Sequence, residues 1–293
     1  MTKDFYHALQ FADPSGQQTP AEFCDTVLGA YGSRRMPVLF SMDIFPRINM
    51  PPGYDATGPI DERKFRHKLS HGDNDDTIPQ GSEVWLDIES PEWAVFYHPP
   101  EAPNWYSAHQ QGIDWRHGLL DIAEQERPDC TFGFYGQVPH VPFRGTLHPD
   151  PQVQQWREEL AVACHPLARR VFLLPYFYHN KRQDGCDTFE DRLRWIRSGL
   201  TDARRFFPES RLIGMTWMEW YDLWKVRPIP DTPEAQTARL LSGWQWWKIN
   251  QAILDLADGV LWWGGRPPGT NTWQPQAEWV DASGELFRAY GNN

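Results

Sequence analysis

The sequence has few cysteines and no long apolar run, and each shortage excludes a class of protein. Its 293 residues include four cysteines, and none of them forms a Cys-x-x-Cys pair, so a zinc site of that kind is not predicted. Their spacing defines no disulfide framework, and we expect free, mostly buried thiols at Cys24, Cys130, Cys164 and Cys186. No apolar run reaches the roughly 18 residues of a membrane span.

A surplus of basic residues is also missing. There are 28 basic and 39 acidic residues, which give a net charge of -11. Phosphate backbones and anionic lipids repel such a protein, so we expect neither a nucleic acid nor a membrane as partner. The N-terminal residues contain no signal-peptide core. We therefore expect a cytoplasmic protein, one exported by another route, or a mature form whose signal has been removed.

Several catalytic motifs are absent as well. The chain contains no Gly-x-Ser-x-Gly elbow and no Walker motif, which argues against a serine hydrolase and a nucleoside triphosphatase. No His-x-His or His-x-x-x-His pair stands at the end of a predicted strand, so we expect no metal site, and no cofactor is implied. The first predicted strand is not followed by the glycine-rich turn of a dinucleotide-binding fold.

Tryptophan, in contrast, is abundant. The chain has 16 tryptophans, and aromatic residues make up 14% of it. Their flat, apolar rings suit stacking on sugars, although a large core rich in tryptophan would use them too. With 40% hydrophobic residues, a large core can form, and the length fits one barrel domain of roughly 250 residues. No linker interrupts the chain, so we predict a single domain over residues 1–293.

Apolar runs typical of buried strands alternate with helical patterns. The predicted strands are residues 37–43, 83–89, 131–135, 170–176, 212–217 and 259–263, with a weaker one at 6–11. The predicted helices are residues 20–30, 108–125, 150–168, 188–207 and 233–256, and Thr19 is a good N-cap for the first. This order predicts an α/β fold, a TIM-like (β/α) barrel with seven or eight strands and some distortion. Residues 45–80 are expected to form a polar loop over its active-site face.

The strand at residues 83–89 ends in two acids, Asp87 and Glu89. Residues two apart on a strand point to the same face, so both carboxyl groups are expected at the mouth of the barrel. Paired acids in a partly apolar site can divide the roles of proton donor and anion, as glycosidic cleavage requires. The alternative is that one of them is a structural ion-pair partner.

Other strand ends carry acids, phenols and indoles, which suit a saccharide cleft. Core packing is the alternative for each aromatic residue. The candidate substrate-binding residues are Asp43, Tyr135, Tyr176, Tyr178, Trp217, Glu219, Trp262 and Trp263.

Four of these strand ends resemble motifs of the hyaluronidase family of glycoside hydrolases. Asp87-Ile88-Glu89 with Trp93 is similar to the family's acid-x-acid stretch. The segments FGFYG at 132–136, FLLPYFY at 172–178 and GVLWWG at 259–264 are similar to three further strands, in the same order. The similarity covers these islands and not the helices or loops, and the family's cysteine pattern is missing. Residues 90–92 also differ from the family's usual residues.

The resemblance implies an enzyme that cleaves a polysaccharide containing N-acetylhexosamine. Glu89 would be the general acid, and Asp87 would polarise the acetamido group that acts as internal nucleophile. Tyr135 and Tyr178 would contact that group, and Trp263 would line the sugar site. Two alternatives remain open. One is a hydrolase of a non-acetylated glycan that uses Glu89 and Glu219 as a carboxylate pair, and the other is a non-catalytic carbohydrate-binding barrel. The oligomeric state is not predicted.

Overall fold

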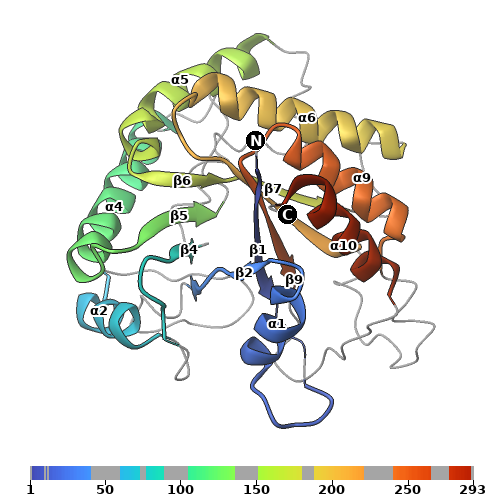
Figure 1. Ribbon diagram of the computed structural model, residues 1–293. Helices are drawn as coiled ribbons and strands as arrows, with labels where there is room; N and C mark the ends of the chain where they lie inside the picture. The colour runs from blue at the N-terminus through green and yellow to red at the C-terminus, as the bar shows by residue number, and fades with distance from the viewer. Residues whose placement is uncertain are drawn as a thin grey trace, which may run out of the picture. The chain divides into compact units, whose positions relative to one another are not determined.

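The computed structural model describes residues 2–9, 11, 13–40, 60–72, 77–88, 105–135, 151–179, 188–220, 240–264 and 277–291. It is an α/β structure in which every strand pair is parallel (Figure 1). The chain divides into two compact units: unit 1 comprises residues 1–35, 176–201 and 213–293, and unit 2 comprises 36–175 and 202–212. The single domain over residues 1–293 stays a prediction.

Unit 1 contains a five-stranded sheet in the order β2-β1-β9-β8-β7. Its strands are β1 (Asp4–Leu9), β2 (Arg34–Arg35), β7 (Tyr176–His179), β8 (Ile213–Trp220) and β9 (Gly259–Gly264). Its helices are α1 (Pro20–Gly29), α9 (Gly243–Leu254), α10 (Glu278–Tyr290) and the first part of α6 (Phe189–Phe206). α1 begins where the sequence predicts, because Thr19 and Glu22 form a capping box ahead of it.

The core of unit 1 lies between this sheet and α9 and α10, and tryptophans fill it. Trp262 of β9 is fully buried and donates its indole N–H to the Asn250 side-chain oxygen in α9, at 2.8 Å. Trp246 of α9 donates likewise to the Ser283 hydroxyl in α10, at 2.9 Å. Both buried indole donors are therefore satisfied, which removes the cost of burying a polar group beside the apolar rings.

Unit 2 contains a four-stranded sheet in the order β3-β4-β5-β6. Its strands are β3 (Val38–Phe40), β4 (Glu83–Asp87), β5 (Thr131–Tyr135) and β6 (Val171–Leu174). Its helices are α2 (Glu62–His71), α4 (Trp105–Glu126), α5 (Pro151–Ala168) and the last part of α6. On one face, the Phe172 ring lies across Gly133, where a side-chain Cβ would come within 2.2 Å of the ring. A side chain at position 133 would therefore force the Phe172 ring to move.

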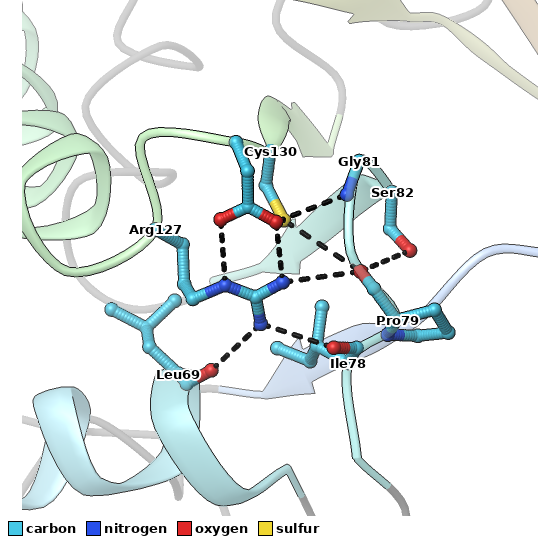
Figure 2. A network of polar contacts seen from close by, with 8 residues as sticks. Leu69, Ile78, Pro79, Gly81, Ser82, Arg127 and Cys130 are labelled. Atoms are coloured by element: carbon cyan, nitrogen blue, oxygen red, sulfur yellow. Dashed lines mark hydrogen bonds and ion pairs between the residues drawn. The ribbon is translucent and has the colours of Figure 1, made fainter.

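A polar network joins the approaches to β4 and β5 in unit 2 (Figure 2). Arg127 donates hydrogen bonds to the backbone carbonyl oxygens of Leu69, Ile78 and Pro79, at 3.1 to 3.3 Å. It also forms a bidentate pair with Asp129, at 2.9 and 2.8 Å. One guanidinium group therefore ties the end of α2 to the segment before β4 and to the segment before β5.

Most predicted strands are present, but one prediction is corrected at Pro175. The strand expected over residues 170–176 is two strands, β6 and β7, which belong to different sheets. Proline has no N–H to donate to a ladder, and this explains the break. The structure also adds β2 and α10, which the sequence pattern did not predict.

One expected loop and one expected helix also differ from the structure. The expected loop over residues 45–80 contains α2, which begins after the N-cap Asp61 and buries Phe65 and Leu69. Of the helix expected over residues 233–256, residues 233–239 lie outside the described residues, and 240–242 are not helical. α9 begins at Gly243, where Ser242 and Gln245 form a capping box.

Cys24, Cys130 and Cys164 are buried free thiols, as expected, and Cys186 lies outside the described residues. Burial raises the pKa of the Cys24 thiol to about 11 and that of the Cys164 thiol to about 12, so both are inert at neutral pH. Among the described helices, none combines the length and the apolar character that a bilayer span requires.

Candidate active site at the strand ends

Asp87 is the last residue of β4 and is 8% exposed. It pairs in register with Phe40 of β3, one position beyond the pair of Leu86 with Phe134. Arg116 of α4 lies over the Phe134 ring, at 5.5 Å, which marks the face that the helices cover. Because strand side chains alternate, Asp87 is on the opposite face, with Trp85. The register therefore places the Asp87 side chain on the face away from the helices, which is the direction expected from the sequence.

The sequence does not show which residues of the neighbouring strands lie beside Asp87. Phe40 is aligned with it in β3, and position 135 in β5 is aligned with Leu174 in β6. These residues make a strand-end row across four parallel strands of unit 2. Periodicity shows which residues share a face of one strand, but the register between strands depends on the assembled sheet. Phe40 and Leu174 supply apolar surface at the level of the carboxyl group.

Glu89, the predicted general acid, lies outside the described residues, and so does Asp43. Tyr135, Tyr178 and Glu219 are placed in β5, β7 and β8 by their backbone, and their side chains lie outside what the structure describes. Within unit 2, the structure thus describes Asp87 and its sheet neighbours. In the parts of the chain that the structure describes, no group of three or more histidine, cysteine and acidic side chains is arranged to hold a metal ion.

A second strand-end row lies in unit 1. Trp217 of β8 pairs in register with Trp263 of β9, and their rings meet edge to face with centroids 4.8 Å apart. Trp217 is buried and Trp263 is partly exposed. Tyr176 of β7 is also partly exposed, and the next residue, Phe177, packs on Trp195 of α6. By alternation, Tyr176 is on the face away from that helix.

Trp262 is placed differently from its neighbour Trp263. Its ring lies on the helix side of β9, within 6 Å of the rings of Phe5, Trp246 and Phe287, and it has no exposed surface. Consecutive strand residues point to opposite faces, so only one of two adjacent tryptophans can face away from the helices. The position of Trp262 is that of a core residue and gives no support to the predicted sugar contact.

Comparison with solved structures identifies the fold. The chain is similar to bee venom hyaluronidase, with 16% sequence identity, a TM-score of 0.55 and coverage of 98% of this chain and 96% of that one. A second structure of the bee venom enzyme, in complex with a hyaluronic acid tetramer, matches with 17% identity, the same TM-score and the same coverage. No protein-family model and no curated protein sequence matches the chain.

These similarities show the fold class, a TIM-like β/α barrel, and confirm that prediction. In the described ranges, the strands are hydrogen-bonded into two parallel sheets and not into one closed ring. The C-terminal ends of the strands form the active-site face in this fold. Asp87, the last residue of β4, therefore stands at the strand end that faces the active-site side of such a fold.

Proposed function

We propose that the protein is a glycoside hydrolase that cleaves a polysaccharide. The position of Asp87 carries this proposal: a carboxyl group that is largely buried, at the C-terminal end of a parallel strand, on the face away from the helices. A carboxylate is rarely buried at such a position without a function, because burying a charge is costly. The fold shared with bee venom hyaluronidase and the motif resemblance support the same function.

The proposed roles follow the hyaluronidase resemblance. Glu89 protonates the oxygen of the leaving sugar, and the bond from that oxygen to the anomeric carbon breaks. The carbonyl oxygen of the substrate's 2-acetamido group attacks the same carbon, and Asp87 stabilises the positive charge that develops on the acetamido nitrogen. Water then opens the cyclic intermediate, with Glu89 acting as base. The substrate of this scheme contains N-acetylhexosamine.

The aromatic strand ends are proposed to bind the sugar. Tyr135 and Tyr178 hydrogen-bond to the acetamido group, and Tyr176 and Trp263 offer ring surface, since both are partly exposed. Trp217 supports Trp263 by its edge-to-face contact. Asp43 and Glu219 remain proposed substrate contacts, and Trp262 is left to the core for the reason given above.

A reducing-end assay tests the function directly. The protein is incubated with hyaluronan, chondroitin, glycol chitin, xyloglucan and mannan, and new reducing ends are counted. Release from the polymers that contain N-acetylhexosamine is the expected result. Release from xyloglucan or mannan alone would instead support the pair Glu89 and Glu219, and no release from any polymer would overturn the proposal of a hydrolase.

A further inference from the structure

Trp244 differs from the other tryptophans whose side chains the structure describes, because it is exposed. Two large apolar side chains in the described ranges are exposed, Val162 on α5 at 69% and Trp244 on α9 at 57%. A single exposed valine on a helix is ordinary, but a tryptophan places a far larger apolar ring in water. The sequence prediction of a helix here did not single Trp244 out, although its spacing from Trp246 and Trp247 shows that the three cannot share one helix face.

α9 has two faces of different character. Trp246, Ile249, Asn250 and Ile253 are buried and form the inner face. Trp244 lies three residues before Trp247, which is partly exposed, so the two residues share the outer face of the helix. Lys248 lies over the Trp247 ring, at 5.0 Å, and hydrogen-bonds to the Gln251 side chain, at 3.3 Å. The outer face thus combines two indoles with polar groups one turn further on.

The start of α9 is fixed firmly. Besides the capping box of Ser242 and Gln245, the carboxylate of Glu278 in α10 accepts a hydrogen bond from the Gly243 backbone N–H at 2.8 Å. A side-chain Cβ at Gly243 would come within 2.8 Å of the Glu278 backbone oxygen, so glycine permits this close approach. The Phe189 ring, at the start of α6, braces Trp244 with ring centroids 5.0 Å apart. Trp244 is therefore exposed and yet held in place, which lowers the entropy cost of binding.

This surface lies at the strand-end side of unit 1. The Leu241 backbone N–H, just before the cap of α9, donates to the Met218 backbone oxygen of β8, at 2.9 Å. Met218 follows Trp217 in the chain, so the start of α9 is tied to the part of β8 that contributes to the strand-end row. α6 begins on the same side, after β7, and Figure 1 shows α6 and α9 as neighbouring helices.

We propose that Trp244 and Trp247, braced by Phe189, form a glycan-binding surface outside the catalytic strand ends, the α9 platform. Its ligand is a run of pyranose rings in a polysaccharide chain. The C–H face of a pyranose is apolar and flat, and it stacks on an indole, while ring hydroxyls reach polar side chains such as Gln251. The inference rests on the proposed function, because it takes the ligand to be the same polymer that is cleaved.

Affinity electrophoresis measures polysaccharide binding by the α9 platform and does not require catalysis. Wild-type protein, Trp244→Ala, Trp244→Phe and the control Val162→Ala migrate through native gels containing hyaluronan, glycol chitin or xyloglucan, and through a gel without polymer. Binding retards the protein, and the dependence of mobility on polymer concentration gives the dissociation constant. Val162→Ala removes the other exposed apolar side chain, so it controls for the loss of apolar surface as such.

We expect Trp244→Ala to weaken binding to at least one polymer by about tenfold, as the loss of one stacking ring should. Trp244→Phe should keep part of the affinity, and Val162→Ala should bind as the wild type does. Equal retardation of wild type and Trp244→Ala would overturn the platform, even if the polymer is cleaved. Retardation that depends on Trp244, without any release of reducing ends, would keep the platform and reject the hydrolase.

A protein partner is the competing use of such a surface. Sedimentation of wild type and Trp244→Ala over a hundredfold range of protein concentration distinguishes self-association from glycan binding. The glycan inference fails if three results occur together: the wild type self-associates, Trp244→Ala stays monomeric, and no polymer retards the wild type. The α9 platform is then an interface between copies. Sedimentation independent of Trp244 together with retardation that depends on it supports the inference.

Discussion

The indole of Trp217 in β8 lies directly against Gly264, the last residue of β9. A side-chain Cβ at position 264 would come within 2.6 Å of the Trp217 indole nitrogen and 2.9 Å of the Met218 sulfur. Trp217 is buried, so a shift of its ring would disturb the packing around it. The glycine after Trp263 is therefore a packing requirement of the strand-end row.

Gly264→Ala should therefore destabilise the protein. Overpacking a buried site of this kind costs about 1–3 kcal/mol of unfolding free energy. Gly118→Ala in α4 is the matched control, because a Cβ there meets nothing within 4 Å. That control should gain about 0.5–1 kcal/mol through helix propensity. Urea denaturation of both variants checks the pair, and equal effects would contradict the packing account.

Truncation of the two adjacent tryptophans of β9 should have different effects on stability and on substrate binding. Trp262→Ala removes a ring from the core of unit 1 and leaves Asn250 without its indole donor, so we expect a loss of about 3–5 kcal/mol in stability. Trp263→Ala should cost less stability and should raise KM for the polymer. Urea denaturation and steady-state kinetics separate the two effects, and a larger stability loss for Trp263→Ala would contradict the assignment of faces.

The pair of Arg127 and Asp129 predicts a dependence of stability on pH. Hydrogen bonds from Arg127 and from the Gly81 backbone N–H hold the pKa of the Asp129 carboxyl well below its usual range. A carboxylate whose folded pKa is lowered stabilises the fold above its unfolded pKa, about 3.9, and loses this effect as the pH falls below that value. The stability gap between wild type and Asp129→Asn should therefore be full at pH 7 and narrower at pH 3.

Urea midpoints of the two proteins at both pH values test this. Asp114→Asn, on the exposed surface of α4, is the control for adding an amide elsewhere. A gap between wild type and Asp129→Asn that is the same at pH 3 as at pH 7 would show that the network does not depend on the charge of Asp129.

The sequence predicts the α/β class well because that signal is local. Apolar runs of strand length, separated by helical periods, are readable in β4, β5, β8 and β9 without knowing what they touch. The break at Pro175 was readable in principle, since proline cannot continue a ladder. α2 was missed because its mean composition is polar, and two buried residues, Phe65 and Leu69, are a weak periodic signal.

The candidate site is harder to predict because it depends on faces and registers. The sequence predicts that both Trp262 and Trp263, at the end of β9, bind sugar. Alternation shows that one of them must turn away, but the identity of that one depends on where α9 and α10 pack. The position of Asp87 at the end of a strand could be predicted from the apolar run before it, and its role in a site stays a prediction.

Glu89→Gln should remove nearly all turnover from a folded protein. The amide keeps the shape of the side chain but cannot supply a proton, and the loss of general acid catalysis typically lowers the rate by about 10² to 10⁴-fold. Circular dichroism and the urea midpoint establish that the variant is folded. Glu219→Gln is the matched variant, since Glu219 takes over as base or nucleophile in the alternative scheme. Near-normal activity of Glu89→Gln would end the assignment of the acid.

Asp87→Asn tests the mechanism rather than the fold. In substrate-assisted cleavage, the positive charge that develops on the acetamido nitrogen needs the Asp87 carboxylate, and a neutral amide cannot stabilise it. We therefore expect Asp87→Asn to lower kcat by about 10² to 10⁴-fold, and a thiazoline mimic of the cyclised intermediate to inhibit the wild type, because sites bind such species more tightly than substrate.

A matched pair of substrates, one with the 2-acetamido group and one with a hydroxyl in its place, separates the two schemes. Substrate assistance requires the acetamido group, so the hydroxyl substrate should not be cleaved and Asp87→Asn should be more damaging than Glu219→Gln. If the hydroxyl substrate is cleaved faster and Glu219→Gln is the more damaging change, two carboxylates perform the reaction. In that case Asp87 only tunes Glu89, and the thiazoline should bind no more tightly than an unreactive sugar.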